Sequence, residues 1–559
     1  MILLFEGYAY PLQALAPLLP VGLYQLCGSD QCQTPYVGYC HYNGQALMLL
    51  PKVFLNENGQ AFGHHHPESL LHFHSPQARQ TFGQEHTANG QTQADFMFSF
   101  SVWLYRAIRQ FRERHQDSAL LQASELLSVS GSGDDSLSEL EIVYSLLRFN
   151  QENQTLFTFI KRFNTSQNRK TSWASTVRRT HPLLQGGKPI YTELVNKEKH
   201  INYDEELLVI YFATLRHLSQ QYGFHVELNP LYALPGKHEF EQFKVSALQR
   251  LKQIRGNYFS DKMLQIWQLL YLYFARQEAM KPSQNFTEIL LVRDFNIVFE
   301  DMMDSLLSDP KENFLEGRLR DQPDGKRVDH IFGYADLLQP DNDRIFHIGD
   351  SKYYKAGAKI GLESVFKQFT YAKNVIQLNI DWLEGGKSVI FRYRDPLTEG
   401  YNPTPNFFIR AFVDEKLDSV NHGLKVLAGN QSYKNIHFPN RLFDRDTLLI
   451  QMYAINFLYV LSAYVSVSEQ ERTQFKHTAR QKFRQEMVEF LKSEFDFFKI
   501  TPHGMSIKEF ISQNFRSWTG RMYCPSDFER ENAILIANAK SEEAVMNWEN
   551  TRVQIWFPE

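Results

Sequence analysis

Two aspartates and a lysine in the C-terminal half of the sequence have types and spacing that could do chemistry. Asp329 lies in the run RVDHIFGYADLL, and Asp350 and Lys352 lie in the run RIFHIGDSKYY. Mg²⁺ binds oxygen ligands and keeps several waters, so one or two carboxylates and a substrate phosphate complete its shell. A neighbouring lysine can orient a water and stabilise charge that develops on the phosphate. The three residues predict Mg²⁺-dependent phosphodiester hydrolysis, with Asp329 and Asp350 holding the ion.

The two runs are strand-like and are separated by turn-forming residues, which predicts a β-hairpin. Side chains alternate along a strand, so Asp329, Asp350 and Lys352 should share one face. Two registers remain open: a four-residue loop sets Asp329 opposite Tyr354, and a two-residue loop or a bulge sets it opposite Asp350. Asp336 points to the other face in either register and is the weaker first carboxylate. A surface ribbon with solvated charges is the competing interpretation.

A helix is expected immediately before this hairpin. Apolar residues recur at helical spacing in IVFEDMMDSLL, residues 297–307. Glu300 then lies beside the buried stripe, where a carboxylate could act as an outer metal ligand through a bound water. A solvated helix residue is the alternative interpretation of Glu300.

The order of these segments carries a resemblance to a known family. A helix with Glu300 is followed by a strand opening with Val328-Asp329, by a strand ending in Asp350-Ser351-Lys352, and then by Lys367-Gln368-Phe369-Thr370-Tyr371. This order resembles the PD-(D/E)XK nucleases, especially their McrC-like and LlaJI-like restriction members. The sequence departs from the motif in having Val328 for the proline and Asp350 for the usual glutamate. Weaker similarity extends to residues 36–38, 50–54 and 171–176.

The resemblance implies an α/β nuclease domain in which helices flank a mixed sheet. It also implies a helix after the lysine strand whose glutamine and tyrosine touch the site or DNA; Gln368 and Tyr371 match loosely, and a plain amphipathic helix is the alternative. The resemblance also implies a separate McrB-like AAA+ GTPase as a partner. This sequence has no GxxxxGK[ST] phosphate loop, so it should not hydrolyse nucleotides through that device. The implied catalytic residues are Glu300, Asp329, Asp350, Lys352 and Gln368.

A basic stretch at residues 161–191 contains lysines, arginines and aromatic residues but no acidic residue. Lysine and arginine neutralise backbone phosphates, and an aromatic side chain can stack on a base or wedge a base step. A solvated basic loop is the competing interpretation. The residues expected to bind double-stranded DNA are Arg169, Lys170, Trp173, Arg178 and Arg179.

Composition places the chain among ordinary globular proteins. With 559 residues, 43% hydrophobic and 22% charged, it should fold into two to four domains rather than remain disordered. The net charge of -4 means that any nucleic-acid surface must be local. Four cysteines do not make a disulfide scaffold in so long a chain, which favours the cytoplasm.

Three domains are expected along the chain. Alternating apolar runs and turn signals predict an N-terminal β-rich module, residues 1–127. The segment SVSGSGDD, residues 128–135, is expected to be a linker. A mixed or helical DNA-binding region follows at 136–285, with helices predicted at 203–222 and 240–277. The nuclease domain, with C-terminal helices, is expected at 286–559.

No membrane association is expected. The run from Leu448 to Val467 approaches the length of a membrane span, but Gln451, Asn456 and several tyrosines interrupt it, which favours a buried helix. The apolar N-terminus contains Glu6 and lacks the basic start of a secretory signal.

Two further groups of potential metal ligands stand apart from the catalytic prediction. Cys27, Cys32, Cys40 and His41 could bind zinc, although their spacing departs from paired C-x2-C motifs and buried thiols are the alternative. A His-rich tract could bind metal or form an exposed loop. Its members are His64, His65, His66, His72 and His74.

The function expected from these patterns is a restriction-type endonuclease that hydrolyses foreign DNA. A DNA repair or recombination nuclease of the same fold is the nearest alternative, and a catalytically silent DNA-binding module is an alternative of another class. Cutting both strands commonly needs two nuclease centres, which favours a homodimer.

Overall fold

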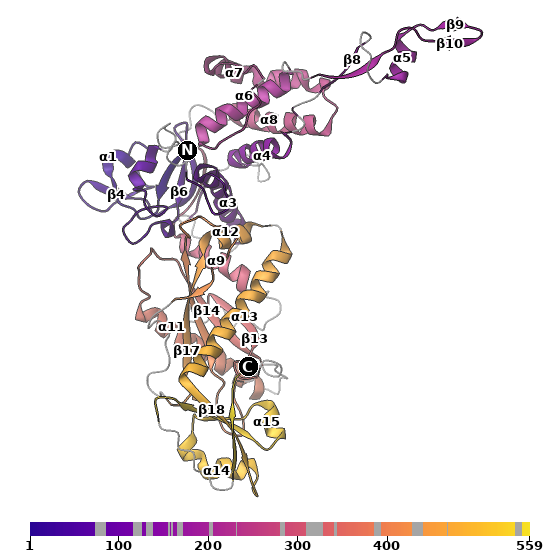
Figure 1. Cartoon of the computed structure of the whole chain (residues 1–559). Coiled ribbons are helices and arrows are strands. Elements are labelled where there is room, and N and C mark those ends of the chain that lie inside the picture. Colours follow the sequence, from indigo (N-terminus) through magenta and orange to yellow (C-terminus); the bar gives the residue numbers. More distant parts are fainter. Residues whose placement is uncertain are drawn as a thin grey trace.

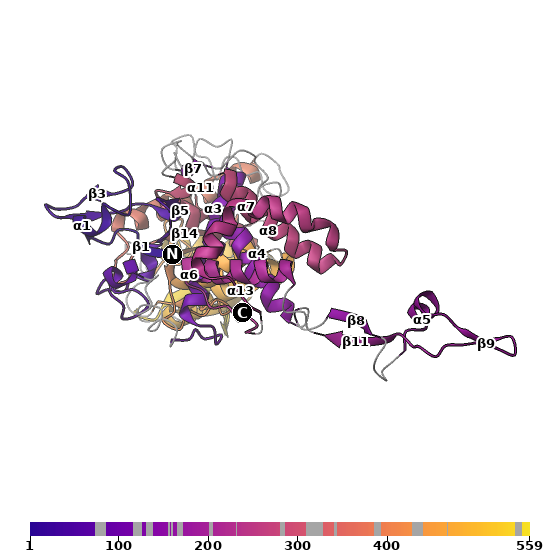
Figure 2. The same cartoon turned by 90° about the horizontal axis from the view of Figure 1, so that it is seen from above.

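In the computed structural model of the chain, the residues described are 1–72, 85–115, 126–129, 138–154, 157, 160–164, 171–200, 205–230, 232–279, 286–308, 328–339, 344–384, 393–427, 440–466, 468–542 and 551–558. The molecule is elongated, with N-terminal elements and a group of helices at one end and the C-terminal half at the other (Figure 1). A thin arm projects from the helices (Figures 1 and 2).

A five-stranded sheet organises the N-terminal end, in the order β1-β6-β5-β12-β7. The strands are β1 (Ile2–Phe5), β5 (Val37–Tyr42), β6 (Gln45–Leu50), β7 (Leu126–Val129) and β12 (Phe286–Val292). Beside it lie a small sheet, β2 (Tyr10–Pro11), β4 (Gln31–Gln33) and β3 (Gln25–Leu26), and the short helix α1 (Leu12–Leu15).

Two expected domain limits fall inside this sheet. Ser128 and Val129 belong to β7 rather than to a linker, and residues 130–135 lie outside the described residues. β12 begins at the limit expected at residue 286, yet it pairs with β5 and β7. Its Leu290 and Val292 enter one apolar core and its Ile289 and Leu291 enter another, so both faces of this strand are buried. A strand apolar on both faces fits the interior of a sheet.

Helices cover this sheet and extend beyond it. They are α3 (Gln93–Arg114), α4 (Glu139–Glu152), α6 (Glu206–Tyr222), α7 (Lys237–Ile254) and α8 (Asp261–Ala279). The helix predicted at 203–222 is confirmed as α6, which ends at Gly223 in the left-handed conformation that favours glycine. The helix predicted at 240–277 is divided into α7 and α8 by a short 3₁₀ turn, Arg255–Asn257.

Buried polar groups join the helices to the sheet. The backbone amide of Glu139 on α4 donates to the Glu288 carboxylate of β12 over 3.2 Å, and Arg276 of α8 pairs with the same carboxylate at 3.2 Å. The Tyr222 hydroxyl of α6 donates to Glu139 over 3.0 Å. Because buried polar groups are costly to leave unpaired, these bonds hold α4, α6 and α8 in one arrangement on the sheet.

The arm consists of two antiparallel ribbons and a short helix. β8 (Ile160–Asn164) pairs with β11 (Asn196–His200), and β9 (Leu183–Gln185) pairs with β10 (Lys188–Ile190). α5 (Trp173–Arg179) lies between them. Gly186 and Gly187, both with positive φ, form the tight turn at the tip.

A mixed five-stranded sheet forms the centre of the C-terminal half, in the order β13-β14-β15-β17-β16. β14, β15 and β17 run parallel, and the edge strands β13 and β16 run antiparallel to their neighbours. The strands are β13 (His330–Ala335), β14 (Arg344–Lys352), β15 (Thr404–Phe412), β16 (Lys425–Val426) and β17 (Leu448–Asn456).

Helices lie on both faces of this sheet, as the predicted mixed-sheet α/β architecture requires. α9 (Phe295–Leu307) and α13 (Glu469–Glu494) cover one face, where the Phe295 ring of α9 contacts the Tyr353 ring and Arg480 of α13 lies over the Phe332 ring. α11 (Leu362–Glu384) covers the other face, where its apolar residues pack with Ile331 and Ile348. The helix predicted at 297–307 is confirmed as α9.

The prediction of a buried helix at 448–467 was wrong in its first half. Residues Leu448–Asn456 form β17, and the helix α12 is limited to Phe457–Val465. All residues of β17, which lies between β15 and β16, are buried. A strand buried on both faces has no alternation of apolar and polar residues, so its sequence cannot be told from that of a buried helix. The Asn456 side chain accepts from the Leu458 amide over 3.1 Å and begins α12. Among the described residues, no helix combines the length and apolarity needed to cross a membrane.

A further sheet lies beyond α13, where mainly helices were expected. Its order is β19-β20-β18-β21. The strands are β18 (Phe495–Pro502), β19 (Met522–Tyr523), β20 (Ile534–Ala539) and β21 (Thr551–Trp556), and the helices beside them are α14 (Ile507–Trp518) and α15 (Ser526–Arg530). Its apolar residues share one core with α11 and the β13–β14 hairpin, so this sheet extends the C-terminal unit.

Candidate active site

The predicted hairpin is confirmed, and its register is the second of the two considered. His330 pairs with Gly349 and Ala335 pairs with Arg344, so continuing the ladder by one residue sets Asp329 opposite Asp350. The connection is longer than a two-residue loop, because β13 ends at Ala335 and β14 begins at Arg344. Asp329, Asp350 and Lys352 therefore lie on one face, at the end of the hairpin remote from its turn.

The three side chains meet at this end of the hairpin. The carboxyl group of Asp329 lies beside that of Asp350, and the Lys352 Nζ lies 2.5 Å from Asp350 Oδ2. Asp350 is only 7% exposed. Burial, followed by the negative charges of Asp350 and Glu300, raises the pKa of Asp329 well above its usual range. Two acids and one ammonium group thus occupy a common, poorly hydrated site.

The same arrangement favours the protonated, charged form of Lys352. Burial alone lowers the pKa of a lysine, because it penalises the charged form. The neighbouring Asp350, Tyr354 and Asp329 together outweigh burial and raise the pKa of Lys352 above its usual value. Lys352 therefore remains a cation that can donate hydrogen bonds to an anionic group.

Glu300 reaches this site from α9, at the edge of β13. Its charge contributes to the raised pKa of Asp329, so the two carboxylates are close. Both line a cavity of about 210 Å³. The other residues that line it are Phe111, His115, Ile297, Asp301 and Asp304. Glu300, which is half-buried, thus lies in the same cavity as Asp329.

Gln368 lies on α11, the helix that covers the same face of the hairpin. Its side chain is fully buried, yet neither its amide oxygen nor its amide nitrogen has a hydrogen-bond partner within the described residues. Leaving a buried amide unpaired is costly, so a ligand that reached Gln368 would gain from pairing with it. Tyr371, one turn later, is 8% exposed and packs in the apolar core.

Asp336 has a different role, at the opposite end of β13. One of its carboxylate oxygens accepts from the Leu338 amide over 3.0 Å, and the other accepts from the Asn402 side chain over 3.0 Å. These bonds hold the chain as it leaves β13. Asp329, not Asp336, is the carboxylate that lies beside Asp350.

The family model described as LlaJI restriction endonuclease matches residues 100–393. This segment is more than half of the chain and contains Glu300, Asp329, Asp350, Lys352 and Gln368. The chain belongs to the LlaJI restriction endonuclease family. No curated protein matches the sequence.

Two solved structures are remotely similar to this family member, and both come from Thermococcus gammatolerans. One contains McrB AAA+ hexamers with bound McrC; the match has 10% identity and a TM-score of 0.26, and it covers 86% of this chain and 99% of that chain. The other is a cryo-EM structure of the McrBC complex; the match has 11% identity and a TM-score of 0.17, and it covers 56% and 90% of the two chains.

The LlaJI-family chain brings residues to the site that sequence patterns did not single out. Asp301, next to Glu300, accepts from the Tyr464 hydroxyl over 2.6 Å and pairs with Arg114 and His115, each at 2.8 Å. Arg114 ends α3 and Tyr464 lies on α12. Nothing in the local sequence indicates these contacts, because the partners are distant along the chain.

The strand that carries Lys352 is also tied to the N-terminal sheet. The Tyr353 hydroxyl donates to Glu6 Oε2 over 2.5 Å and accepts from the Lys52 backbone amide over 3.1 Å. The Lys52 ammonium lies 3.4 Å from Glu6 and 4.6 Å from the centre of the Tyr353 ring. Lys355 donates to the Gly7 carbonyl over 2.6 Å. Residues that follow Lys352 therefore contact the segments that follow β1 and β6.

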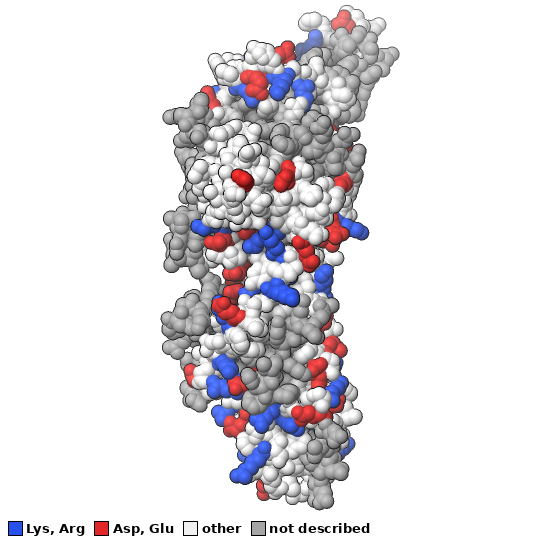
Figure 3. All heavy atoms as spheres, turned by 90° about the vertical axis from the view of Figure 1, so that its left-hand side faces the viewer, with Lys and Arg blue, Asp and Glu red and all other residues white. Residues whose placement is uncertain are grey.

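The residues expected to bind DNA are not part of this cluster. Trp173 begins α5 on the arm and is 60% exposed, and Arg178 and Arg179 lie exposed in the last turn of the same helix. The arm projects away from the helices, and β13 and β14 lie in the opposite half of the molecule (Figure 1). Arg169 and Lys170 lie outside the described residues. On the face drawn in Figure 3, acidic and basic side chains are interspersed.

The four residues considered as zinc ligands do not converge within the described part of the chain. Cys32 and Cys40 are buried in an apolar core beside the first sheet, and Cys27 is exposed. His41 follows Cys40 on β5, so the two side chains point to opposite faces. Buried thiols explain Cys32 and Cys40.

Proposed function

We propose that this chain is a Mg²⁺-dependent restriction endonuclease with a PD-(D/E)XK nuclease domain, and that it hydrolyses phosphodiester bonds of foreign DNA. The observation that supports the proposal is the convergence of Asp329, Asp350 and Lys352: Asp329 lies beside Asp350, and the Lys352 ammonium group lies 2.5 Å from Asp350. Two carboxylates held this close repel each other when both are ionised, and a divalent cation removes that repulsion. The donor set therefore fits a hard metal ion.

Each residue has a separate role in this proposal. Asp329 and Asp350 would hold Mg²⁺, with Glu300 as an outer ligand through water. Bound there, the ion would supply an acidified water and neutralise charge on the phosphate. Lys352 orients the attacking water and donates to a phosphate oxygen as its negative charge grows. The buried Gln368 amide, which has no hydrogen-bond partner among the described residues, positions a group of the substrate.

The proposed partners are double-stranded DNA and a separate McrB-like AAA+ GTPase. Exposed Trp173, Arg178 and Arg179 on the arm would contact DNA, since cations pair with phosphates and an indole can stack on a base. The sequence contains no phosphate loop of the GxxxxGK[ST] type, so GTP hydrolysis would be performed by the other polypeptide. A homodimer would supply two centres for cutting both strands.

Substitution at the cluster tests the nuclease proposal. Asp350→Ala and Lys352→Ala should each abolish Mg²⁺-dependent cleavage of methylated and unmethylated plasmid, measured with and without a GTPase and GTP. DNA affinity, measured by fluorescence anisotropy, should stay within about twofold, because the changes remove transition-state contacts. Lys359→Ala, at an exposed lysine shortly after β14, is the matched control and should cut normally. Cleavage retained by Asp350→Ala would refute the proposed site.

A further inference from the structure

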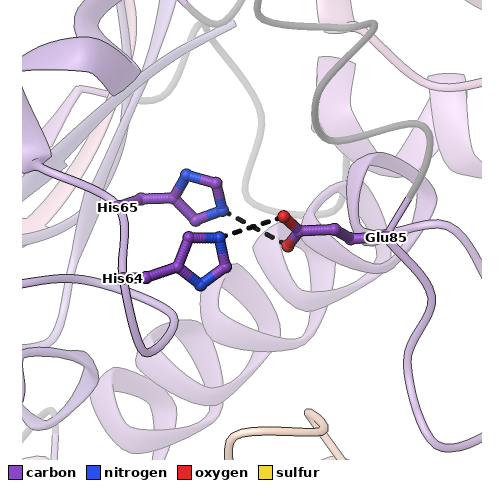
Figure 4. A group of neighbouring side chains, drawn as sticks. All are labelled: His64, His65 and Glu85. Atoms are coloured by element: carbon purple, nitrogen blue, oxygen red, sulfur yellow. Dashed lines mark hydrogen bonds and ion pairs between the residues drawn. The ribbon is translucent and has the colours of Figure 1, made fainter.

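A second group of metal-binding side chains lies at the N-terminal end of the molecule. His64 Nε2 lies 3.0 Å from Glu85 Oε1, and His65 Nε2 lies 3.3 Å from Glu85 Oε2. The ligand atoms of all three residues lie within 4.8 Å of one another. Figure 4 shows both rings directing a nitrogen toward the same carboxylate. The ring nitrogens of two consecutive histidines thus lie beside one carboxylate.

The backbone holds the two histidines in this unusual arrangement. His65 and Ala61 exchange two backbone hydrogen bonds, of 2.8 and 2.9 Å, across a tight turn. Phe62 and Gly63 in that turn have positive φ, and the Gly63 carbonyl accepts from the Asn56 side chain over 3.0 Å. The rings of His64 and His65 consequently lie side by side, with centroids 4.0 Å apart. Ligands fixed in advance bind a metal with less loss of conformational entropy.

Glu85 is held from the other side by the start of α3. Its carbonyl accepts from the Gln93 amide over 3.0 Å, and His86 and Thr92 form an isolated bridge that closes this turn. The Ala88 amide in the same turn donates to the Lys416 carbonyl of the C-terminal half over 2.7 Å. The carboxylate is therefore presented by a turn that also contacts the other half of the molecule.

We propose that His64, His65 and Glu85 form a site for a borderline transition-metal ion, with Zn²⁺ as the best match. Two imidazole nitrogens and one carboxylate are ligands of zinc, and ligand atoms about 2.1 Å from the ion in a tetrahedron lie ~3.4 Å apart. The two His–Glu distances are close to this value. The fourth position is left to water. Mg²⁺ prefers an all-oxygen shell, so the site differs in chemistry from the aspartate cluster.

Occupancy of this site would add a metal link between the turn at His64 and His65 and the turn that precedes α3. The ion would link the turn at His64 and His65 to Glu85, closing a loop, and loop closure by a metal stabilises the folded state. The turn that begins at Glu85 leads into α3, whose other end supplies Arg114. Arg114 and the following His115 pair with Asp301 beside the proposed catalytic site. The metal would thus fix the beginning of a helix whose end packs against the site.

Metal binding by the full-length protein tests this proposal separately from DNA cleavage. The chain carrying Asp350→Ala is stripped with a chelator and titrated with Zn²⁺ in excess Mg²⁺, and bound zinc is counted by equilibrium dialysis with elemental analysis. One zinc per chain is expected. His65→Ala and Glu85→Gln should weaken binding by at least ~10-fold, since each removes a direct ligand. The Asp350→Ala background makes the result independent of nuclease activity.

His66→Ala is the matched control, because His66 is the exposed neighbour of the site and is not a member of the cluster. It should bind zinc like its parent. Zinc should raise the Tm of the parent and of His66→Ala but not of His64→Ala, whose exposed side chain can be removed without loss of packing. Equal zinc affinity in the parent, His64→Ala and Glu85→Gln, or equal loss in His66→Ala, would overturn the proposal.

Discussion

At the scale of single residues, the buried polar groups at the end of the β13–β14 hairpin destabilise the fold unless a ligand pairs with them. Burial and the nearby charges of Asp350 and Glu300 raise the pKa of Asp329 and favour its protonated form. Gln368 is buried on α11, and neither its amide oxygen nor its amide nitrogen has a hydrogen-bond partner within the described residues. Both features are expected where a ligand completes the polar contacts, because a chain selected for stability alone would avoid them.

Asparagine substitutions should show whether Asp329 or Asp336 is the carboxylate that binds the metal together with Asp350. Asp329→Asn should abolish cleavage, because it removes a charge from the proposed metal site. Asp336→Asn should lower the Tm, because Asp336 accepts bonds from Leu338 and Asn402, while the folded protein keeps cutting. Plasmid cleavage assays and thermal unfolding measure the two effects. An inactive but stable Asp336→Asn protein would contradict this assignment.

Gln368→Leu should separate stability from activity. The change replaces a buried amide that has no hydrogen-bond partner among the described residues by an apolar group of similar size, which should stabilise the fold by about 1 kcal/mol. If Gln368 positions substrate, the cleavage rate should fall in the same variant. Denaturant unfolding and single-turnover cleavage measure the two quantities. A stabilised variant with an unchanged rate would show that Gln368 has no part in the reaction.

At the scale of elements, β14 connects the proposed catalytic residues with the N-terminal sheet. Lys352 ends the strand, and Tyr353 points to the opposite face, where it contacts Phe295 and Phe299 of α9 and bonds to Glu6 of the N-terminal segment. The position of Lys352 therefore depends on packing between two halves of the chain.

Tyr353→Phe should reveal this dependence. Loss of the hydroxyl leaves the buried Glu6 without one of its donors and should cost about 1–2 kcal/mol of stability. The rate constant for cleavage should fall while DNA affinity is retained, because the change acts on the position of Lys352 and not on contacts with DNA. Single-turnover rates and anisotropy provide the two readouts. Equal rates in Tyr353→Phe and the parent would show that the contact serves stability alone.

At the scale of the whole molecule, the arm separates the proposed DNA-binding residues from the catalytic hairpin. α5 lies on the arm, beyond α6 and α8, while β13 and β14 lie in the other half (Figure 1). A long duplex, or movement of DNA relative to the chain, would be needed for one molecule to use both regions.

Replacing both arm arginines should weaken DNA binding in a salt-dependent way. Each phosphate contact contributes about 0.9 to the slope of log affinity against log salt, so Arg178→Ala combined with Arg179→Ala should reduce the slope by up to ~2. Anisotropy titrations over a series of salt concentrations measure it. Lys359→Ala removes one cation elsewhere and should leave the slope unchanged. An unchanged slope in the double variant would move the DNA contacts to another surface.

The local features of the candidate site could be predicted from the sequence. Alternation along the two runs placed Asp329, Asp350 and Lys352 on one face in either register, and apolar spacing predicted α9 and α6. These predictions depend only on the geometry of one strand or one helix. The turn-rich connection permits more than one loop length, so the choice between the two registers required the packed sheet.

Contacts between distant segments were decided by the tertiary structure alone. Residues 448–456 form a strand because their backbone groups pair with those of the neighbouring strands β15 and β16. β12 pairs with β5 in the first sheet, although it begins the C-terminal half of the chain. Glu6, Lys52 and Arg114 approach the hairpin region from far along the chain. The period of a sequence determines which face of an element is apolar, but it does not specify which other element will cover that face, because pairing is a property of the whole packed chain.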